Sequence, residues 1–386
     1  MTMRERPLPA DPDPARRIAL AVIGAVSRAR PADAVLRDVL ESERGASPAV
    51  RREAVRTVFA WYRWLGWTDP KASLASRLER ALEVAKRFAG RPESFADADL
   101  LAKALPGWLA REMEPDAAFA RALQAEPRVW LRAKPGTGAA LAAALGQCRP
   151  LGTGALADAL AYEGSEDLFL RPEFTAGAFE IQDTGSQLVG LMCAPKPGET
   201  WWDACAGEGG KTLHLSALME NRGSVWATDR AEWRLRRLRR RAARAQAFNL
   251  RWAIWEGGPK RPNRVHYDGI LVDAPCSGMG TWARNPHARW STTAGDVREL
   301  ASLQLRLLAH TAPALVPGGR LLYAVCTLTR AETVDTAAAL VARCPELEPL
   351  PLANPLRPGD PPAPVHALMP HETGGNGMWV AAWRRR

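Results

Sequence analysis

The spacing of hydrophobic and polar residues changes twice along the chain. Between residues 14 and 124, apolar residues recur every three or four positions, as in the run from Ala49 to Leu65, and prolines interrupt the pattern. This spacing places apolar side chains on one face of a helix, and the alternation typical of strands is absent. We therefore predict a small all-helical domain over residues 14–124.

The first residues have no such pattern. Residues 1–13 are polar and rich in proline, which predicts a disordered tail, and they lack the apolar core of a signal peptide. No apolar run in the chain approaches the ~20 residues needed to cross a membrane. We expect a cytoplasmic protein that does not bind a membrane.

After Pro127, the helical spacing of apolar residues gives way to short strand-like runs. Strand-like runs occur at Arg128–Arg132, Asp167–Leu170 and Ala178–Ile181, and a helical run lies at Gly138–Leu145. This order of elements is typical of a small RRM-like or ferredoxin-like module. We assign such a module to residues 125–178.

From residue 179 to residue 386, strand-like and helix-like runs alternate. The expected strands are Thr200–Cys205, Ser224–Asp229, Leu250–Trp255, Tyr267–Ala274, Arg320–Cys326 and Met378–Trp383. The expected helices are Lys211–Met219, Ala231–Ala247, Asp296–Ala314 and Arg330–Ala342. Regular alternation predicts an α/β domain with a doubly wound sheet. The last strand follows a proline-rich loop, which allows antiparallel closure of the sheet.

The stretch from Tyr267 to Gly278 combines a buried strand with reactive residues. The strand ends at Asp273, and Pro275 and Cys276 follow before a glycine turn. Ligands of open α/β sheets bind beyond the carboxyl ends of the strands, so this position predicts a site. The alternative is a structural loop with a buried cysteine, since free cysteines are commonly buried.

A glycine-rich loop follows the first strand of this domain. Gly207, Gly209 and Gly210 allow a ligand to approach backbone amides at the start of a helix. Their spacing matches neither the phosphate-binding loop of NTPases nor the dinucleotide fingerprint. Asp229 ends the next strand, where a carboxylate can bind ribose hydroxyls. The combination favours an adenosine-bearing ligand over a polyphosphate, although tight helix packing alone would also require glycines.

The composition suggests a polyanionic binding partner and argues against a zinc site and against a disulfide framework. The net charge is +10 and the pI is near 9.7, as in proteins that bind nucleic acid. Eight arginines lie between Arg230 and Arg244, where a solvated helix face and phosphate contact are both open interpretations. The six cysteines form no CxxC pair, which argues against zinc and against a disulfide framework. We expect no metal.

Four motifs then resemble a known family. They are Asp203–Thr212 (DACAGEGGKT), Asp273–Gly278 (DAPCSG), Arg284–Trp290 (RNPHARW) and Tyr323–Thr327 (YAVCT). In this order they resemble the RsmB/NOP family of RNA cytosine-5 methyltransferases, bacterial rRNA branch. The resemblance covers residues 180–386.

The resemblance implies a Rossmann-like class I methyltransferase domain over residues 179–386, with a seven-stranded sheet and S-adenosylmethionine as cofactor. Residues 125–178 match the position of the family's small RRM-like subdomain. Residues 14–124 are similar to the NusB-like RNA-binding extension of the bacterial branch. That extension points to small-subunit (16S) rRNA as the substrate, and we expect a monomer.

The resemblance also assigns roles to residues. Cys326 is the nucleophile and Cys276 assists release of the product, with Asp273 and Lys211 beside them. The residues expected to bind the cofactor are Cys205, Ala206, Gly207, Glu208, Gly209, Gly210, Lys211, Asp229, Glu256 and Asp273. Those expected to contact RNA are Arg284 and Arg234.

The implied chemistry explains why two cysteines are needed. Carbon 5 of cytosine is a poor nucleophile, and a thiolate that adds to carbon 6 activates it, which is covalent catalysis. A base must afterwards remove the proton from carbon 5 so that the thiol can leave. Free cysteine has a pKa near ~8.5, so a nearby positive charge such as that of Lys211 favours the thiolate.

The sequence departs from the family pattern at three places. Gly207-Glu208 replaces Ala-Pro in the loop, Val325 replaces a threonine before the nucleophile, and the third cofactor acid is Glu256.

Two other functions stay open. A DNA cytosine-5 methyltransferase would use Cys276 as nucleophile, but the expected Glu-Asn-Val segment is absent. A catalytically silent RNA-binding ribosome-assembly factor is the second alternative.

Overall fold

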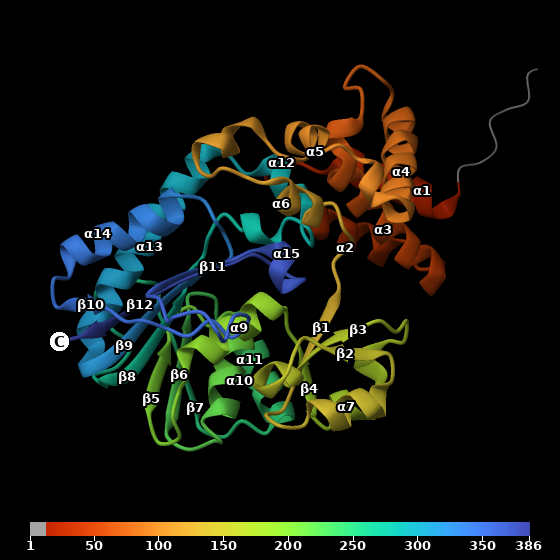
Figure 1. The fold of residues 1–386 in the computed structure, drawn as a ribbon. Coiled ribbons are helices and arrows are strands. Elements are labelled where there is room, and N and C mark those ends of the chain that lie inside the picture. The colour runs from red at the N-terminus through yellow and green to blue at the C-terminus, as the bar shows by residue number, and fades with distance from the viewer. Residues whose placement is uncertain (1–12) are drawn as a thin grey trace, which may run out of the picture. The chain divides into compact units, whose positions relative to one another are not determined.

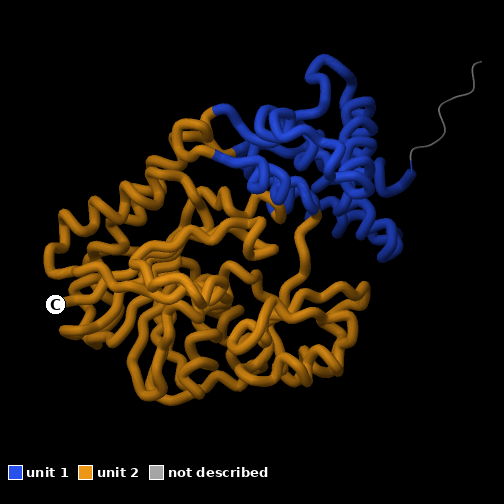
Figure 2. Tube along the Cα trace, in the orientation of Figure 1, with its two compact units in different colours: residues 1–107, 115–125, 285–291 blue, residues 108–114, 126–284, 292–386 orange. Residues whose placement is uncertain are grey.

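The computed structural model describes residues 13–386, which form two compact units (Figure 2). Unit 1 contains residues 13–107, 115–125 and 285–291, and unit 2 contains residues 108–114, 126–284 and 292–386. The predicted tail lies outside the described residues except for Asp13, whose side chain caps the first helix. No helix in residues 13–386 is long and apolar enough to cross a membrane.

The described part of unit 1 contains helices and turns but no strand. Its main helices are α1 (Pro14–Ala25), α2 (Ala32–Ser42), α3 (Pro48–Trp64), α4 (Leu74–Gly90), α5 (Asp97–Ala104), α6 (Ala117–Ala122) and α12 (Pro286–Ser291). Ser47 and Ser73 cap α3 and α4 by accepting hydrogen bonds from the backbone amides three residues later. Trp64 packs against Phe88 and Phe95 in the interior. The helical spacing of the sequence thus corresponds to buried helix faces.

Helix α12 packs within unit 1 although its neighbours in sequence belong to unit 2. Its Arg289 is fully buried and donates to the carbonyl oxygens of Ala104 and Leu123 and to Oε1 of Gln124, at 2.7–3.0 Å. Burial lowers the pKa of Arg289 to about 9. Arg289 of the RNPHARW segment therefore has a structural role in unit 1, which sequence periodicity did not indicate.

Unit 2 begins with a four-stranded antiparallel sheet in the order β2-β3-β1-β4. Its strands are β1 (Val129–Ala133), β2 (Cys148–Pro150), β3 (Ala159–Tyr162) and β4 (Phe179–Ile181), with helices α7 (Gly138–Leu145) and α8 (Pro172–Thr175). The prediction of a strand at Asp167–Leu170 is wrong. That segment is a short 3-10 helix because the Asp167 side chain accepts a hydrogen bond from the amide of Phe169.

The larger sheet of unit 2 is mixed, in the order β10-β12-β9-β8-β5-β6-β7, and β11 also pairs with β12. The parallel strands are β5 (Thr200–Asp203), β6 (Ser224–Asp229), β7 (Leu250–Ile254), β8 (Tyr267–Asp273) and β9 (Leu315–Val325). The antiparallel end consists of β10 (Leu347–Pro349), β11 (Val365–Leu368) and β12 (Met378–Arg385). The doubly wound sheet and its antiparallel closure are confirmed, but the sheet has eight strands within residues 13–386 instead of the expected seven, because β11 adds a second partner to β12.

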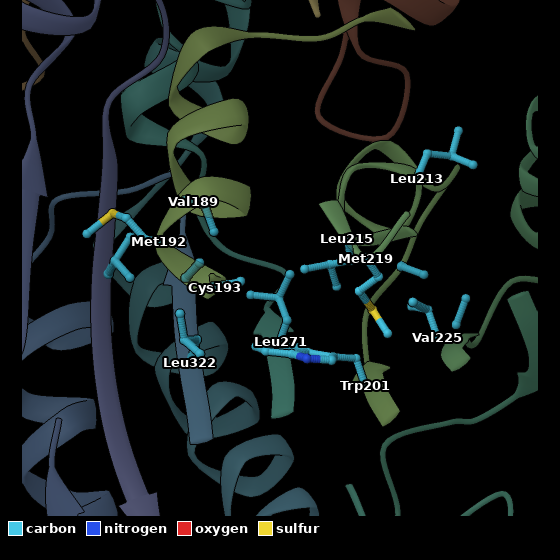
Figure 3. Packing of buried hydrophobic residues seen from close by; sticks show 14 of the residues in the cluster. Val189, Met192, Cys193, Trp201, Leu213, Leu215, Met219, Val225, Leu271 and Leu322 are labelled. Atoms are coloured by element: carbon cyan, nitrogen blue, oxygen red, sulfur yellow. The ribbon is translucent and has the colours of Figure 1, made fainter. Parts of the chain in front are cut away.

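Helices cover both faces of this sheet (Figure 1). They are α9 (Thr184–Cys193), α10 (Gly210–Leu218), α11 (Glu232–Ala245), α13 (Ala294–Thr311) and α14 (Thr336–Arg343), while the short α15 (Pro370–Thr373) precedes β12. Side chains alternate between faces along a strand, so Trp201 packs against α9 and α10 (Figure 3), whereas Trp202 lies in the cluster formed with α13 and α14. Two apolar layers thereby fix the carboxyl ends of β5, β8 and β9.

Candidate active site

The two cysteines that end adjacent strands lie together. Strands β8 and β9 are parallel, with Asp273 paired to Ala324, so the loops that follow them leave the same edge of the sheet. The Sγ atoms of Cys276 and Cys326 are 3.3 Å apart, and both residues are partly exposed. The amide of Gly280 donates to the carbonyl oxygen of Cys326 at 2.9 Å and joins the two loops.

The surroundings of the two thiols shift their pKa values in opposite directions. The hydrogen bond between them, burial and the charge of Glu332 raise the pKa of Cys276 well above its ordinary value. The same hydrogen bond lowers the pKa of Cys326, and the positive charges of Lys211 and Arg284 add to this while burial and Asp273 oppose it. The arrangement therefore favours Cys326 as thiolate and Cys276 as the thiol that donates to it.

Lys211 reaches this centre from the start of α10. Its Nζ lies 2.6 Å from Oδ2 of Asp273 and 3.1 Å from Oγ of Ser186. Burial alone would lower the pKa of Lys211, but the charge and hydrogen bond of Asp273 raise it above its ordinary value. The Lys211 ammonium group therefore keeps its positive charge near the thiols, and that charge lowers the pKa of Cys326.

Different structural constraints act on Gly207 and Gly209 in the loop after β5. Gly207 and Gly209 both have positive φ, at 54° and 89°. A Cβ at Gly209 would lie 2.6 Å from Cγ of Leu238, so that glycine is required by packing against α11. A Cβ at Gly207 would meet nothing within 4 Å. Gly207 is therefore the point at which a ligand can approach the backbone.

Asp229 holds this loop at the carboxyl end of β6. Its two carboxylate oxygens accept hydrogen bonds from the amides of Gly207 at 3.0 Å and Ala231 at 2.8 Å. Each carboxylate oxygen has two acceptor sites, so capacity remains for hydroxyl groups of a ligand. The side chain is largely buried, and Arg234 lies 3.6 Å from it. Arg234, predicted to contact RNA, is thus placed beside the predicted cofactor acid.

The unusual Glu208 of this loop has basic partners on α11. Its Oε1 accepts from Arg237 at 2.7 Å, and its carbonyl oxygen accepts from Arg241 at 2.8 Å. Arg241 and Arg244 also bind the buried carboxylate of Glu180. Part of the arginine-rich helix therefore serves contacts within the unit rather than solvent alone.

The remaining predicted site residues, Glu256 and Arg284, lie on the surface of the protein. Glu256 follows β7 and is exposed, and it forms no ion pair among the described residues. Arg284 is exposed, and its charge acts on both Cys326 and Asp183. A cavity of about 240 Å³ between the small sheet and the ends of α10 and α11, lined by residues such as Lys134, contains none of the predicted site residues.

The donor and acceptor set fits a cofactor that carries hydroxyls and a positive charge. Oδ1 of Asp203 is buried and has no hydrogen-bond partner among the described residues, while its Oδ2 accepts from Thr212 at 2.7 Å. Burial raises the pKa of Asp203 to about 7. Asp203 and Asp229 thus provide unused hydrogen-bond acceptors at the carboxyl ends of β5 and β6, near the accessible backbone of Gly207. Residues 13–386 contain no cluster of side chains that could hold a metal ion.

The structure also contains a buried polar network that no sequence motif had indicated. Glu332, on the π-helical turn Ala331–Asp335, has no exposed surface and contacts Ser277, Gln304 and Thr329. The spacing Thr329-x-x-Glu332 is the signal that could have pointed to it, but this spacing is typical of an exposed helix-capping box.

The chain is similar in sequence to known methyltransferases. Residues 190–384 match the family model described as 16S rRNA methyltransferase RsmB/F. Probable ribosomal RNA small subunit methyltransferase B of Synechocystis is 41% identical over 166 residues, which cover 42% of this chain and 36% of that protein. Ribosomal RNA small subunit methyltransferase B of Vibrio cholerae is 33% identical over 228 residues, covering 58% of this chain and 50% of that protein. The match thus spans half of these relatives or less.

Solved structures extend the likeness in fold. The crystal structure of PH0851 has a TM-score of 0.73 at 20% identity and covers 98% of this chain and 100% of its own. A methyltransferase homologue from Pyrococcus horikoshii has a TM-score of 0.57 at 26% identity, covering 70% of this chain and 90% of its own. NSun6 from Pyrococcus horikoshii, solved with SFG, has a TM-score of 0.52 at 25% identity, and the match covers 57% of this chain and 56% of that chain.

Proposed function

The chain belongs to the 16S rRNA methyltransferase RsmB/F family, and we propose that it methylates carbon 5 of a cytosine in small-subunit rRNA. The observation that carries the proposal is the pair of thiols at 3.3 Å with pKa values shifted in opposite directions. A single nucleophile would serve many reactions, whereas a thiolate beside a protonated thiol suits addition followed by elimination.

S-adenosylmethionine is the cofactor, and it supplies an electrophilic methyl group. Asp229 would bind the ribose hydroxyls, and the backbone around Gly207 would lie against the bound molecule. Asp203 and Asp273 would supply negative charge to the same region. Lys211 keeps Asp273 oriented through the 2.6 Å contact.

Cys326 acts first in the proposed reaction. Its thiolate adds to carbon 6 of the cytosine, a new S–C bond forms, and the electron pair of the C5–C6 double bond makes carbon 5 nucleophilic. Lys211 and Arg284 favour the thiolate before the attack. Strand β9, paired on both sides by β8 and β12, holds Cys326 in place.

Cys276 acts on release. Once carbon 5 carries the methyl group, a base accepts the carbon-5 proton, the electron pair of that C–H bond re-forms the C5–C6 double bond, and the S–C bond breaks with its electron pair returning to Sγ of Cys326. Cys276 lies at the same edge, within contact of Cys326, and it assists this elimination. A DNA-type arrangement would need Cys276 as the nucleophile, and its raised pKa opposes that assignment.

The other parts of the chain fit RNA binding. We propose that the RRM-like subdomain expected over residues 125–178 extends to residue 181, since β4 pairs with β1 and completes the order β1-α7-β2-β3-α8-β4, which is the βαββαβ order of that module. We also propose that residues 14–124 form a NusB-like RNA-binding domain. The net charge of +10 supports a nucleic-acid partner.

Bisulfite mapping of total RNA tests the proposed function. RNA from cells that lack the gene should contain one or more unmethylated cytosines that become resistant to deamination after incubation with the purified protein and S-adenosylmethionine. No gain of resistance, or methylation of duplex DNA at an equal rate, would contradict the proposal. A salt titration should also weaken RNA binding steeply, because phosphate contacts release counterions.

A further inference from the structure

A fully buried carboxylate connects the two loops that carry the thiols. Oε1 of Glu332 accepts hydrogen bonds from the amide of Ser277 at 2.8 Å and from Nε2 of Gln304 at 2.9 Å. Oε2 accepts from the hydroxyls of Ser277 at 2.5 Å and Thr329 at 2.8 Å. All four sites of the carboxylate are thus used. Among the described residues, Glu332 forms no ion pair with a basic side chain.

The partners of Glu332 flank both cysteines in sequence. Ser277 directly follows Cys276, and Gln304 also donates to the carbonyl oxygen of Pro275, directly before it, at 2.9 Å. On the other loop, the hydroxyls of Ser277 and Thr327 lie 2.9 Å apart, and Thr327 directly follows Cys326. One side chain therefore spans the distance between the two catalytic loops.

A purely stabilising role accounts poorly for this arrangement. Burying a carboxylate without a cation is unfavourable, and apolar side chains of similar size generally stabilise a protein interior better. The network also lies at the site edge rather than in the apolar clusters of the sheet. A π-helical turn holds Glu332, and such turns occur frequently at functional sites.

The two cysteines do not depend equally on this network. Cys326 directly follows strand β9, which is paired on both sides. Cys276 lies three residues beyond the end of β8, in a loop held by Glu332 through Ser277 and by Gln304 through Pro275. Loss of the carboxylate would displace Cys276 more than Cys326.

We propose that Glu332 is a positioning residue that holds the Cys276 thiol against Cys326. The proposal deepens the proposed function and, for its catalytic consequence, rests on it. Without Glu332, Cys326 still attacks carbon 6, but the elimination that Cys276 assists is slowed. The enzyme would then accumulate as a covalent complex with its RNA.

The first measurement needs neither RNA nor cofactor. Diamide oxidises two adjacent thiols to a disulfide, and the two thiol hydrogens pass to its nitrogen atoms. Mass spectrometry of digested protein would follow the rate at which the Cys276–Cys326 disulfide forms. We expect Glu332→Ala to slow it by roughly a hundredfold, the effect of a displacement of about 1 Å on an intramolecular reaction.

A conservative variant separates geometry from charge. In Glu332→Gln, the amide oxygen can accept from Ser277 N and Gln304, and the amide nitrogen can donate to the hydroxyls of Ser277 and Thr329, because hydroxyls also accept. This variant should recover most of the disulfide rate. Asp335→Ala, on the same turn but exposed, is the matched control and should leave the rate at the wild-type value.

The second measurement uses RNA and S-adenosylmethionine. Glu332→Ala should yield a protein–RNA species that survives denaturing electrophoresis, and Glu332→Gln should yield much less. A wild-type protein that fails to methylate any RNA would contradict the proposed function and leave the disulfide result to decide the role of Glu332. A wild-type rate of disulfide formation in Glu332→Ala, or an equal loss in the alanine and glutamine variants, would overturn the positioning role.

Should Glu332→Ala fail to fold, Ser277→Ala provides a milder change. It removes one hydroxyl from the network but keeps the backbone amide that Glu332 accepts from. It should slow disulfide formation less than the loss of the carboxylate and more than Asp335→Ala. A rate equal to that of the control would contradict the proposal.

Discussion

The Sγ atoms of Cys276 and Cys326 lie 3.3 Å apart although 50 residues separate them in sequence. Their proximity follows from the parallel pairing of β8 and β9, whose loops leave the same edge of the sheet. The hydrogen bond between the thiols makes them unequal, because it raises the pKa of one and lowers that of the other. The unequal pair supports two separate roles in one reaction.

Asp229 should contribute directly to cofactor affinity. We expect Asp229→Ala to weaken binding of S-adenosylmethionine by about 1.5–3 kcal/mol, the range for hydrogen bonds to a charged group. Isothermal titration calorimetry would measure the change. Glu232→Ala, which removes an exposed carboxylate from the following helix, is the control and should keep the wild-type affinity. An unchanged affinity in Asp229→Ala would remove the assignment.

Asp203 should make stability depend on pH. Burial raises its pKa to about 7 in the folded state, whereas the unfolded value is about 4. The folded protein therefore binds this proton more tightly, and the free energy of unfolding falls as pH rises from about 4 to about 7. The contribution is on the order of 4 kcal/mol. Urea unfolding at several pH values should show a weaker fall in Asp203→Asn than in the wild type.

The control for this prediction is Asp335→Asn, which removes a charge at an exposed position. It should keep the wild-type dependence on pH. If Asp203→Asn shows the same fall as the wild type between pH 4 and 7, a different group is responsible. The same measurement with saturating S-adenosylmethionine should show a smaller fall in stability with pH, because a ligand that donates a hydrogen bond to Oδ1 of Asp203 favours the ionised carboxylate.

Arg289 should matter for the stability of unit 1 rather than for chemistry. Its guanidinium group satisfies two carbonyl oxygens and the side chain of Gln124 in the interior. Arg289→Ala leaves these buried acceptors without a partner, at about 1–3 kcal/mol each before relaxation. We expect a loss of about 3 kcal/mol in the free energy of unfolding, measured by urea denaturation. Arg284→Ala, exposed and five residues earlier, should lose much less stability.

The sequence predicted best what depends on local pattern. The strands that carry Asp273 and Cys326, the glycine loop and the helical pattern of unit 1 follow from periodicity and motif spacing. Strand β3 (Ala159–Tyr162) was missed because its residues are uniformly buried and include two alanines, which are poor strand formers. A local pattern carries no information on such a strand's partners.

Contacts between distant segments could not be predicted in the same way. Glu332 lies 55 residues from Ser277, and Arg289 lies 185 residues from Ala104. Neither spacing has a periodic signature, so a motif that contains one of these residues does not reveal that its side chain is buried or which partners it has. Buried polar side chains of this kind become visible only when the fold brings their partners together.

The last prediction separates the two cysteines by the consequences of their loss. Cys326→Ala removes the nucleophile, so it should form no covalent adduct, should not methylate RNA and should bind RNA reversibly. Cys276→Ala retains the nucleophile but lacks the group that assists elimination, so it should attack, methylate and then stall. Denaturing electrophoresis after incubation with RNA and S-adenosylmethionine would show the stalled protein–RNA species.

The double variant is the decisive control, because the stalled species requires the Cys326 thiol to form at all. Replacing both cysteines should therefore abolish the species seen with Cys276→Ala. A species trapped by Cys326→Ala and not by Cys276→Ala would reverse the two roles and indicate the arrangement of DNA methyltransferases. Intact methylation in both single variants would show that the thiols, 3.3 Å apart as they are, do not take part in the reaction.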